Sequence, residues 1–465
     1  MPTSQVSWEG WEFSLSESGV LRIVEQEVWV ADLSLASAGW ELIRTEEYPE
    51  ELVTSWRRAG VTLEVCNTFY DLWTMRWSWS NDSGEPLELS TPTFSVVSPC
   101  TTQCWDGREQ GWLVFDRAGD IVVGELVKGS MELIDQTDER TSVRLSANPQ
   151  INLDATGSGG SLQAVWRFDT VKRLSDLAAK LPPWWPARTV LQAGEECEIS
   201  LPDGSIEGED VSQVEDGFVL ESAVTGARSA LVHHGRSTIK LDWYVTESLD
   251  TALTRRANEL INDVTEPDTV QQFLVLKAIT RQLIPLSEDA EAWLQKPTMT
   301  ENGTVFGVAN LTMRGQLFRD DEALLKAQRL ATTPPMTFGA VFAWIGTFLA
   351  AQLRGLPLEP PPLGSPIGGA PRRLVEAEQA WLRYSVDPMR LGDLRWMVHL
   401  MGGDLPLRSL SAKSLAQAVS LARHLPENLE AHWDWARDLG SIRQAAEGKL
   451  LAANPDDETL AWLSF

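Results

Sequence analysis

The sequence predicts an N-terminal antiparallel β-sandwich followed by an all-α domain of helical hairpins. Before about residue 170, short apolar runs are separated by turn-forming residues such as Asn81-Asp82-Ser83-Gly84, a spacing typical of antiparallel sandwiches. After Ser248, apolar residues recur every three or four positions in short segments. At 465 residues the chain is too long for one ordinary core, so two or three domains are expected.

The change of hydrophobic period falls between Gly235 and Ile261. At first every second residue is apolar, as in a half-buried strand: Ile239, Leu241, Trp243 and Val245. The apolar residues that follow share one face of a helix: Leu249, Leu253, Ala257, Leu260 and Ile261. Ser248 or Asp250 is available to cap the free N–H groups of this helix. The segment is therefore expected to join the two halves.

Four regions follow from these patterns. Residues 1–170 are expected to form the β-sandwich. Residues 171–188 are a linker, in which a short helical pattern ends at Pro182-Pro183-Trp184-Trp185-Pro186 because proline supplies no N–H group. Residues 189–246 form a second strand-rich unit, which is small for an independent domain and is expected to pack on the first. Residues 247–465 form the α-helical hairpin domain.

Two segments of the helical half need separate interpretation. Residues 336–353 carry no charge, and a run of this length is the lower limit for crossing a bilayer. We expect a buried helix instead, because Gly339, Gly346 and Gln352 interrupt the run and the neighbouring segments supply no partner spans. The proline- and glycine-rich residues 355–371 fit neither helix nor strand. A lid over a site and a plain connector both remain open for this loop.

Charge limits the partners of the chain. With 66 acidic and 39 basic residues, the formal net charge is -27. Such a field repels phosphate backbones and anionic lipids, so we expect neither nucleic acid nor a membrane surface as a partner. The first residues have neither the basic nor the apolar region of a secretory signal, which predicts a cytoplasmic location. The oligomeric state does not follow from the sequence.

Metal and cofactor motifs are absent from the sequence. A zinc site built from Cys100, Cys104, His233 and His234 matches no local zinc spacing, so we expect no metal. There is also no GxxxxGK[ST] loop, no GxGxxG, no GxSxG elbow and no HExxH. Nucleotide-dependent, serine-hydrolase and zinc-protease chemistry therefore lack their usual motifs, and no cofactor is expected.

Tryptophan and carboxylate residues are the remaining chemical signal. The chain has 21 Trp against 4 Tyr, and several indoles lie beside acids, as in Trp8-Glu9 and Trp40-Glu41. An indole face matches the apolar face of a pyranose ring, and carboxylates bind sugar hydroxyl groups. A pair of carboxyl groups also hydrolyses glycosidic bonds, one as acid and the other as base or nucleophile. A small carbohydrate is therefore the expected ligand.

The sharpest candidate site is the segment from Cys104 to Trp112. Asp106 and Glu109 lie there on a glycine-flanked loop, with Trp105 and Trp112 on either side. In the functional interpretation the acids are catalytic and the indoles bind the substrate. In the structural interpretation the segment is an ordinary hairpin whose indoles pack on the core.

Three acids of the helical half are further catalytic candidates. Glu301 lies on a loop just before a helix, and Asp320 and Asp321 lie between two helices. The alternatives are structural. Asp320 is well placed to cap the helix that runs through Leu330, and Glu301 fits a solvated loop residue.

One stretch resembles a known family. Residues Trp77 to Leu89 are similar to the strand, Asn-x-x-Gly-x-Pro-Leu turn and strand of β-super-sandwiches. With the order of the two halves, the chain resembles carbohydrate-active enzymes that join an N-terminal β-super-sandwich to a C-terminal (α/α) toroid. The resemblance implies a toroid-like helical half and glycoside processing. The helical part is shorter than the catalytic toroid usual in that family.

Two functions are consistent with these observations. The first is a carbohydrate-binding or glycoside-processing protein, hydrolase-like if catalytic, whose carboxylate pair comes from Asp106, Glu109, Glu301, Asp320 or Asp321. The second is a non-catalytic binding or scaffold protein. A cleft where the halves face each other, lined by two carboxylates about 5 to 10 Å apart, would favour the enzyme. Large exposed apolar patches would favour the scaffold.

Overall fold

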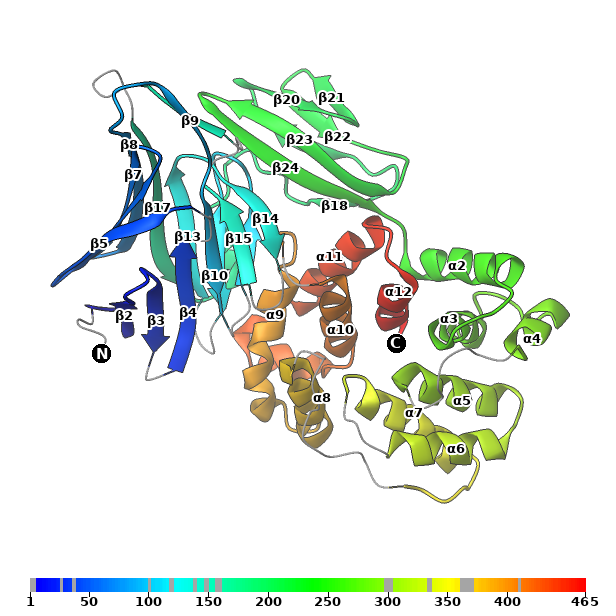
Figure 1. Cartoon of the computed structure of the whole chain (residues 1–465). Coiled ribbons are helices and arrows are strands. Elements are labelled where there is room, and N and C mark those ends of the chain that lie inside the picture. Colours follow the sequence, from blue (N-terminus) through cyan, green and yellow to red (C-terminus); the bar gives the residue numbers. More distant parts are fainter. Residues whose placement is uncertain are drawn as a thin grey trace.

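The fold class is confirmed: sheets of mostly antiparallel strands come first in the chain, and helices follow (Figure 1). The structure is a computed structural model. It describes residues 6–25, 28–35, 39–98, 102–116, 121–136, 140–145, 150–154, 161–296, 304–332, 337–359, 372–408 and 411–465.

Two large sheets dominate the N-terminal half. The strands are β1 (Val6–Trp8), β2 (Trp11–Leu15), β3 (Leu21–Glu25), β4 (Val28–Leu35), β5 (Glu41–Tyr48), β6 (Glu51–Arg58), β7 (Val61–Phe69), β8 (Trp73–Asn81), β9 (Leu87–Ser90), β10 (Thr93–Val97), β11 (Thr102–Trp105), β12 (Trp112–Asp116), β13 (Ile121–Lys128), β14 (Glu132–Gln136), β15 (Arg140–Arg144), β16 (Gln150–Leu153) and β17 (Ser161–Val171). The seven-stranded sheet has the order β1-β2-β3-β4-β10-β15-β14, and the eight-stranded sheet has the order β11-β12-β13-β17-β8-β7-β6-β5. Alternate side chains of both sheets, among them Trp73, Trp77 and Phe94, share one buried core.

The turn after β8 joins two strands, as expected from the resemblance, but these strands belong to different sheets. The strands on either side of it, β8 and β9, do not pair with each other, because β9 pairs with β16 in a separate two-stranded sheet. The buried Asn81 amide fixes this geometry. Its Nδ2 donates to the carbonyl oxygens of Glu85, at 2.6 Å, and Asp154, at 2.9 Å, and its Oδ1 accepts from the Ser83 N–H at 3.0 Å. The asparagine therefore joins the turn to β16 instead of closing a hairpin.

The linker holds one short helix, α1 (Leu174–Ala178), and leads into the second strand-rich unit. Its strands are β18 (Val190–Gln192), β19 (Cys197–Ser200), β20 (Gly204–Gly208), β21 (Val211–Val214), β22 (Gly217–Leu220), β23 (Gly226–His234) and β24 (Ser237–Thr246). They form a four-stranded sheet, β18-β24-β23-β20, and a three-stranded sheet, β19-β22-β21. Buried residues of this unit, of the sandwich and of the helical half share one core, which includes Trp112, Trp243 and Val398. The unit thus packs on the sandwich and on the helices together.

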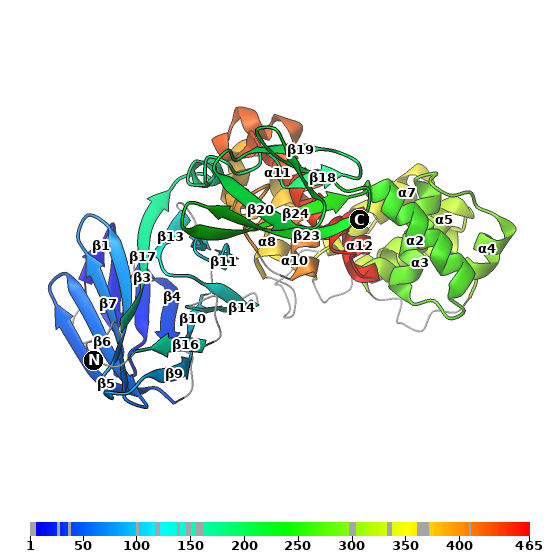
Figure 2. The same ribbon diagram turned by 90° about the horizontal axis from the view of Figure 1, so that it is seen from above.

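The helical half consists of short helices. They are α2 (Leu249–Asp263), α3 (Thr269–Thr280), α4 (Glu288–Leu294), α5 (Val305–Leu317), α6 (Asp321–Ala331), α7 (Ala340–Leu353), α8 (Arg372–Tyr384), α9 (Arg395–Met401), α10 (Ala412–Arg423), α11 (Leu439–Ala452) and α12 (Asp457–Ser464). Three 3₁₀ segments join them, η1 (Pro388–Leu394), η2 (Glu427–Ala431) and η3 (Asp434–Ala436). Figure 2 shows α2 to α5 and α7 at one end of the molecule and the sandwich at the other.

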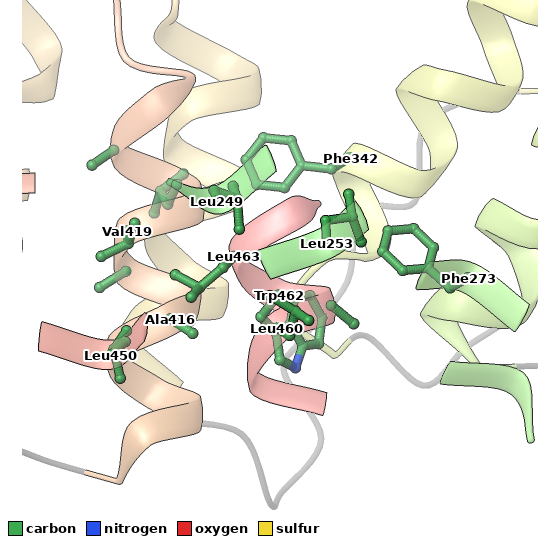
Figure 3. Packing of buried hydrophobic residues seen from close by; sticks show 14 of the residues in the cluster. Leu249, Leu253, Phe273, Phe342, Ala416, Val419, Leu450, Leu460, Trp462 and Leu463 are labelled. Carbon is green, nitrogen blue, oxygen red and sulfur yellow. The ribbon is translucent and has the colours of Figure 1, made fainter. Parts of the chain in front are cut away.

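The last helix, α12, holds the helical half together. It packs on α2 and α3 on one side and on α10 on the other. Figure 3 shows Leu460, Trp462 and Leu463 of α12 between Leu253 of α2 and Val419 of α10. One continuous apolar core therefore joins segments that are about two hundred residues apart in the chain.

The predicted joint is confirmed in its details. In β24 the alternating residues Ile239 and Trp243 are buried, and in α2 the residues of the predicted helical face, such as Leu253, are buried. Of the two cap candidates, Ser248 is the N-cap: its side chain accepts from the Thr251 N–H at 3.1 Å.

The uncharged stretch forms a helix that is shorter than its apolar run. Helix α7 begins at Ala340, after Gly339 with φ 89°, and no side chain of its own segment caps it. Glu378 of α8 caps it instead, accepting from the N–H groups of Gly339, at 2.8 Å, and Phe342, at 3.0 Å. Leu353 at the other end is exposed. Among the helices of the described residues, none has the length and apolar character needed to span a membrane.

The start of the proline-rich loop packs against helices. The Glu359 N–H donates to Gln328 of α6 at 3.0 Å, and the Glu359 carbonyl accepts from the Trp344 indole of α7 at 3.2 Å. Residues 360–371, the rest of the predicted lid or connector, lie outside the described residues.

Candidate functional site

The sharpest predicted segment forms the hairpin of β11 and β12. Trp105 and Trp112 lie directly opposite each other across the two strands, with ring centroids 4.9 Å apart in an edge-to-face arrangement. They are 3% and 1% exposed, within the core shared by the sandwich, the second strand-rich unit and the helices. Both indoles therefore lie as the structural interpretation has them, inside the core.

The two acids of this hairpin connect different parts of the chain. Asp106 is buried, and its Oδ1 lies 3.6 Å from Nε of Arg408, which also donates from its second nitrogen to Asp242 at 3.0 Å. Glu109 is exposed and accepts from the Thr238 N–H of β24 at 3.0 Å. The backbones of Cys104 and Arg408 form a β-bridge. Asp106 and Glu109 thus hold the helical half and the second strand-rich unit to the hairpin.

Arg408 lies near two carboxylates at this junction, those of Asp106 and Asp242. Burial acts to raise the pKa of Asp242, but the positive charges of Lys240 and Arg408, with the hydrogen bonds they donate, bring that pKa below its ordinary value. The cluster therefore keeps Asp242 ionised over the neutral range, with both carboxylates near the guanidinium group of the exposed Arg408.

The acids of the helical half lie elsewhere. Asp320 is the N-cap of α6 and accepts from the Ala323 N–H at 3.0 Å, as its structural alternative predicts. Asp321 pairs with Arg354 at 2.7 Å. Glu301 lies outside the described residues. Figure 2 places α5 and α7, which pack on α6, far from β11. The fold thus brings Asp106 and Glu109 together and keeps Asp320 and Asp321 apart from them.

A cleft with the expected combination of side chains lies where the linker faces the helices. We call it the linker cleft. Its volume is about 500 Å³, and it is lined by the following residues: Ala178, Leu181, Pro182, Pro183, Trp185, Pro186, Ala187, Gly402, Gly403, Asp404, Leu405, Asp438, Ser441 and Ile442. One indole, two carboxylates and one hydroxyl thus line a single concavity between the strand-built and helical halves.

The linker forms the aromatic wall of this cleft. Trp185 is half-buried, and its ring lies edge-to-face on Trp105 with 5.2 Å between centroids. Trp184 lies beside it at 5.6 Å and is buried. The Trp185 backbone N–H donates to the Pro182 carbonyl at 2.9 Å, which closes a tight turn among the prolines. Trp105 therefore supports from the core an indole that borders the cleft.

The loop after α9 forms the floor. Gly402 and Gly403 have φ values of 67° and 57°, a left-handed conformation that favours glycine. The carbonyl oxygens of Gly403 and Leu405 accept from the Lys449 ammonium of α11 at 2.6 and 2.7 Å. Asp404 accepts from the Thr189 N–H at 3.3 Å. The floor is thus held from both halves of the molecule.

Helix α11 supplies the opposite wall. Asp438, the residue before it, is exposed, and its side chain makes no capping hydrogen bond. The Ser441 hydroxyl donates to the Asp438 carbonyl at 2.9 Å. A ligand hydroxyl entering the cleft would thus meet a carboxylate whose oxygens are not used in capping.

The sequence did not single out any residue of this cleft as functional. Trp185 lies within a proline segment that ends a helix, and Asp404 and Asp438 lie in no motif. The available signal was the composition of residues 182–186, because two adjacent indoles enclosed by prolines cannot both enter a regular core.

The described residues of the zinc alternative do not come together as a set of metal ligands. Cys100 lies outside the described residues, and burial raises the pKa of the Cys104 thiol, with a contribution from the charge of Asp106. Across the described part of the chain, no three His, Cys, Asp or Glu side chains group as a metal site.

Comparison with known proteins gives a match at the level of the fold. Neither a protein-family model nor a curated protein sequence matches the chain. Among solved structures, a polysaccharide lyase aligns over 94% of this chain and 79% of its own, with a TM-score of 0.50 and 10% identity. A glycoside hydrolase family 81 enzyme from Clostridium thermocellum aligns over 97% of this chain and 66% of its own at 9% identity, but its TM-score of 0.22 is too low for a structural argument. The chain therefore has the architecture expected from the resemblance, a strand-built half followed by a helical half, and this fold is similar to that of the aligned polysaccharide lyase.

Proposed function

We propose that this protein binds a carbohydrate in the linker cleft. The observation that carries the proposal is the meeting of Trp185, Asp404 and Asp438 in one concavity between the two halves. The indole provides an apolar face for a pyranose ring, and the carboxylates accept hydrogen bonds from sugar hydroxyl groups. Ser441 adds a group that both donates and accepts.

The dimensions of the cleft fit a ligand of this class. A volume of about 500 Å³ lies within the usual range for small-molecule sites, and apolar walls with a few polar groups are typical of them. The similar fold of a polysaccharide lyase, a protein named for action on polysaccharides, supports the same ligand class. With 10% identity, that likeness carries no residue roles.

Titration calorimetry with a panel of neutral and uronic-acid oligosaccharides tests the proposal. At least one member is expected to bind, and Trp185→Ala is expected to weaken that binding at least tenfold, equivalent to about 1.4 kcal/mol, because the stacking face is lost. Trp344→Ala, which removes a half-buried indole of α7 outside the cleft, is the matched control and should retain wild-type affinity. Equal loss in both variants, or no binding by any member, would contradict the proposal.

Catalysis is the stronger form of the proposal. In this form, a pair of carboxyl groups cleaves the bound glycan. The pair comes either from the cleft acids Asp404 and Asp438 or from the five acids that the sequence singled out. Those five are Asp106, Glu109, Glu301, Asp320 and Asp321. Changing each acid to its amide separates the sets, because only a member of the reacting pair should abolish turnover while saccharide binding remains. If no amide variant loses turnover of a glycan that the protein binds, the function is binding alone.

A further inference from the structure

A second pocket, distinct from the linker cleft, lies at the joint between β24 and α2. Its volume is about 500 Å³, and we call it the joint pocket. It is lined by Ser248, Leu249, Asp250, Lys277, Arg281, Arg423, His424, Arg443, Glu447, Ser464 and Phe465. Helix α11 borders both cavities, contributing Ser441 and Ile442 to the linker cleft and Arg443 and Glu447 to the joint pocket.

Cationic side chains outnumber carboxylates in the joint pocket. One lysine and three arginines line it together with two side-chain carboxylates and a histidine, although the whole chain carries a net charge of -27. The two carboxylates are already engaged. Asp250 lies 2.8 Å from Arg281, and Glu447 pairs with Arg423. Lys277 and Arg443 are thus the two remaining cations of the pocket, which these two ion pairs do not include.

These two cations have few partners of their own. The Lys277 ammonium donates to a main-chain oxygen of Phe465, the last residue of the sequence, at 3.4 Å, which is a long hydrogen bond. The buried Arg443 Nε has no hydrogen-bond acceptor among the described residues. A buried guanidinium nitrogen without an acceptor is costly, and an oxyanion would supply one.

The pKa values of two groups in the joint pocket indicate the same excess of positive charge. Burial lowers the pKa of Lys277 to about 8, with further lowering from the charges of Arg281 and Arg423. Burial also lowers the pKa of His424, as do the charges of Lys277 and Arg423. The charges of Arg281 and Arg423 therefore oppose the protonation of Lys277, and those of Lys277 and Arg423 oppose the protonation of His424, so a bound anion would relieve this repulsion.

We propose that the joint pocket binds a small organic ligand that carries a carboxylate or phosphate group. The charged group would lie against Lys277 and Arg443, because the other cations are paired. The rest of the ligand would contact the apolar wall of Leu249 and Phe465. The volume, far larger than a single inorganic oxyanion needs, leaves room for such an organic part. This site does not depend on the carbohydrate proposal for the linker cleft.

Titration calorimetry of the full-length protein tests the site, with glucuronate, glucose 6-phosphate and methyl glucoside as probes. At least one anionic probe is expected to bind at least tenfold more tightly than neutral methyl glucoside, and the comparison of the two anions identifies the preferred group. Arg443→Gln and Lys277→Gln should each weaken anion binding at least tenfold. Arg255→Gln, which removes the same charge from the exposed outer side of α2, should change it less than twofold.

The pH dependence gives an independent readout. Anion affinity should fall as pH rises through about 8, because Lys277 then loses its proton. The other groups facing Lys277 are Arg281 on its own helix, Asp250 on α2, Arg423 and His424 at the end of α10, Arg443 and Glu447 on α11, and Phe465 after α12. Lys277→Gln should abolish the step near pH 8 and leave any step from His424 at lower pH.

Two outcomes would overturn the proposal. In the first, neither anion binds better than methyl glucoside. In the second, Arg255→Gln weakens binding as much as Arg443→Gln, which would indicate a general charge effect. If Arg443→Gln does not fold, phenylglyoxal labelling of Arg443 in the wild-type protein replaces it. The anionic probe should protect Arg443 and leave Arg255 reactive, and lack of protection would contradict the site.

Discussion

Replacing Lys449 with alanine is expected to lower the free energy of unfolding by about 3 to 5 kcal/mol, the largest effect of any single change considered. The Lys449 ammonium donates to the carbonyl oxygens of Gly403 and Leu405, and it lies 5.9 Å from the centre of the Tyr244 ring in β24. The alanine variant would leave both acceptors without their donor and open a cavity between α11 and the sheet. Urea denaturation of the wild type and the variant measures the loss.

Methionine at the same position separates packing from hydrogen bonding. Lys449→Met keeps most of the apolar volume and removes the donor, so its cost should be smaller than that of alanine. Both variants should loosen the floor of the linker cleft, because the loop at Gly403 loses its attachment to α11. Hydrogen exchange of residues 402–405 reports that loosening. If Lys449→Ala is as stable as the wild type, the ammonium does not hold the loop at Gly403 and Leu405 to α11.

The pH dependence of the wild type has a definite sign. Burial lowers the pKa of Lys449 to about 8, although the charge of Asp404 acts to raise it. Between this value and 10.5, the ordinary lysine pKa, the unfolded chain binds one proton more than the native state. The contribution of Lys449 to stability therefore rises with pH across this window and is constant below it. The difference between the wild type and Lys449→Met isolates this contribution from other titrating groups.

Glu378→Ala is expected to cost about 2 to 4 kcal/mol, the second-largest effect. Its carboxyl group caps helix α7 from α8, accepting from the N–H groups of Gly339 and Phe342. The N-cap residue, Gly339, has no side chain that could replace this cap, so alanine would leave buried donors without the acceptors that they have among the described residues. Glu378→Gln retains one acceptor oxygen and should cost less. Glu322→Ala, at an exposed position of α6, should change stability by less than about 0.5 kcal/mol.

Glu378 also predicts a falling stability at neutral pH. Burial raises the pKa of this carboxyl group from 4.5 to about 8, against the opposing effect of the backbone N–H groups of Phe342 and Gly339. Between these two values the native state binds one proton more than the unfolded chain, so stability should decrease as pH rises from 4.5 to 8. Glu378→Gln should remove that decrease. An unchanged pH profile in the variant would show that Glu378 does not titrate in this range.

Local patterns in the sequence were sufficient for elements whose geometry is set within a few residues. The alternation through Trp243 predicted β24, the spacing from Leu249 predicted α2, and Ser248 and Asp320 cap the helices they were expected to cap. Each depends on the period of side chains or on a bond to a residue three positions away. For this reason the order of strands and helices, and hence the fold class, followed from the sequence.

Contacts between elements that are distant in the chain did not follow from the sequence. The beginning of α7 depends on Glu378, which lies in the next helix beyond the proline-rich loop. The period-two pattern of β11 and β12 shows that Trp105 and Trp112 share a face of their hairpin, but not that the helical half covers this face. The cluster of tryptophans and acids in the sequence thus indicated a segment at the junction of the two halves, but not that its indoles, Trp105 and Trp112, are buried there.

The linker cleft illustrates the same limit. Trp185, Asp404 and Asp438 come from the linker, a loop after α9 and the start of α11, so no local spacing relates them. They meet because the linker and the helices pack on a common core around Trp105 and Val398. Only the packing of whole elements on that core determines this meeting, and sequence periodicity does not encode it.

Hydrogen exchange measured by mass spectrometry, with and without the tightest-binding oligosaccharide of the panel, tests the central claim most directly. The account predicts ligand protection in three segments that are separate in sequence: residues 178–187, 402–405 and 438–442. The β11–β12 hairpin and the joint pocket should exchange as in the free protein. Protection confined to the loop of Asp106 and Glu109, with none in the three segments of the linker cleft, would contradict it.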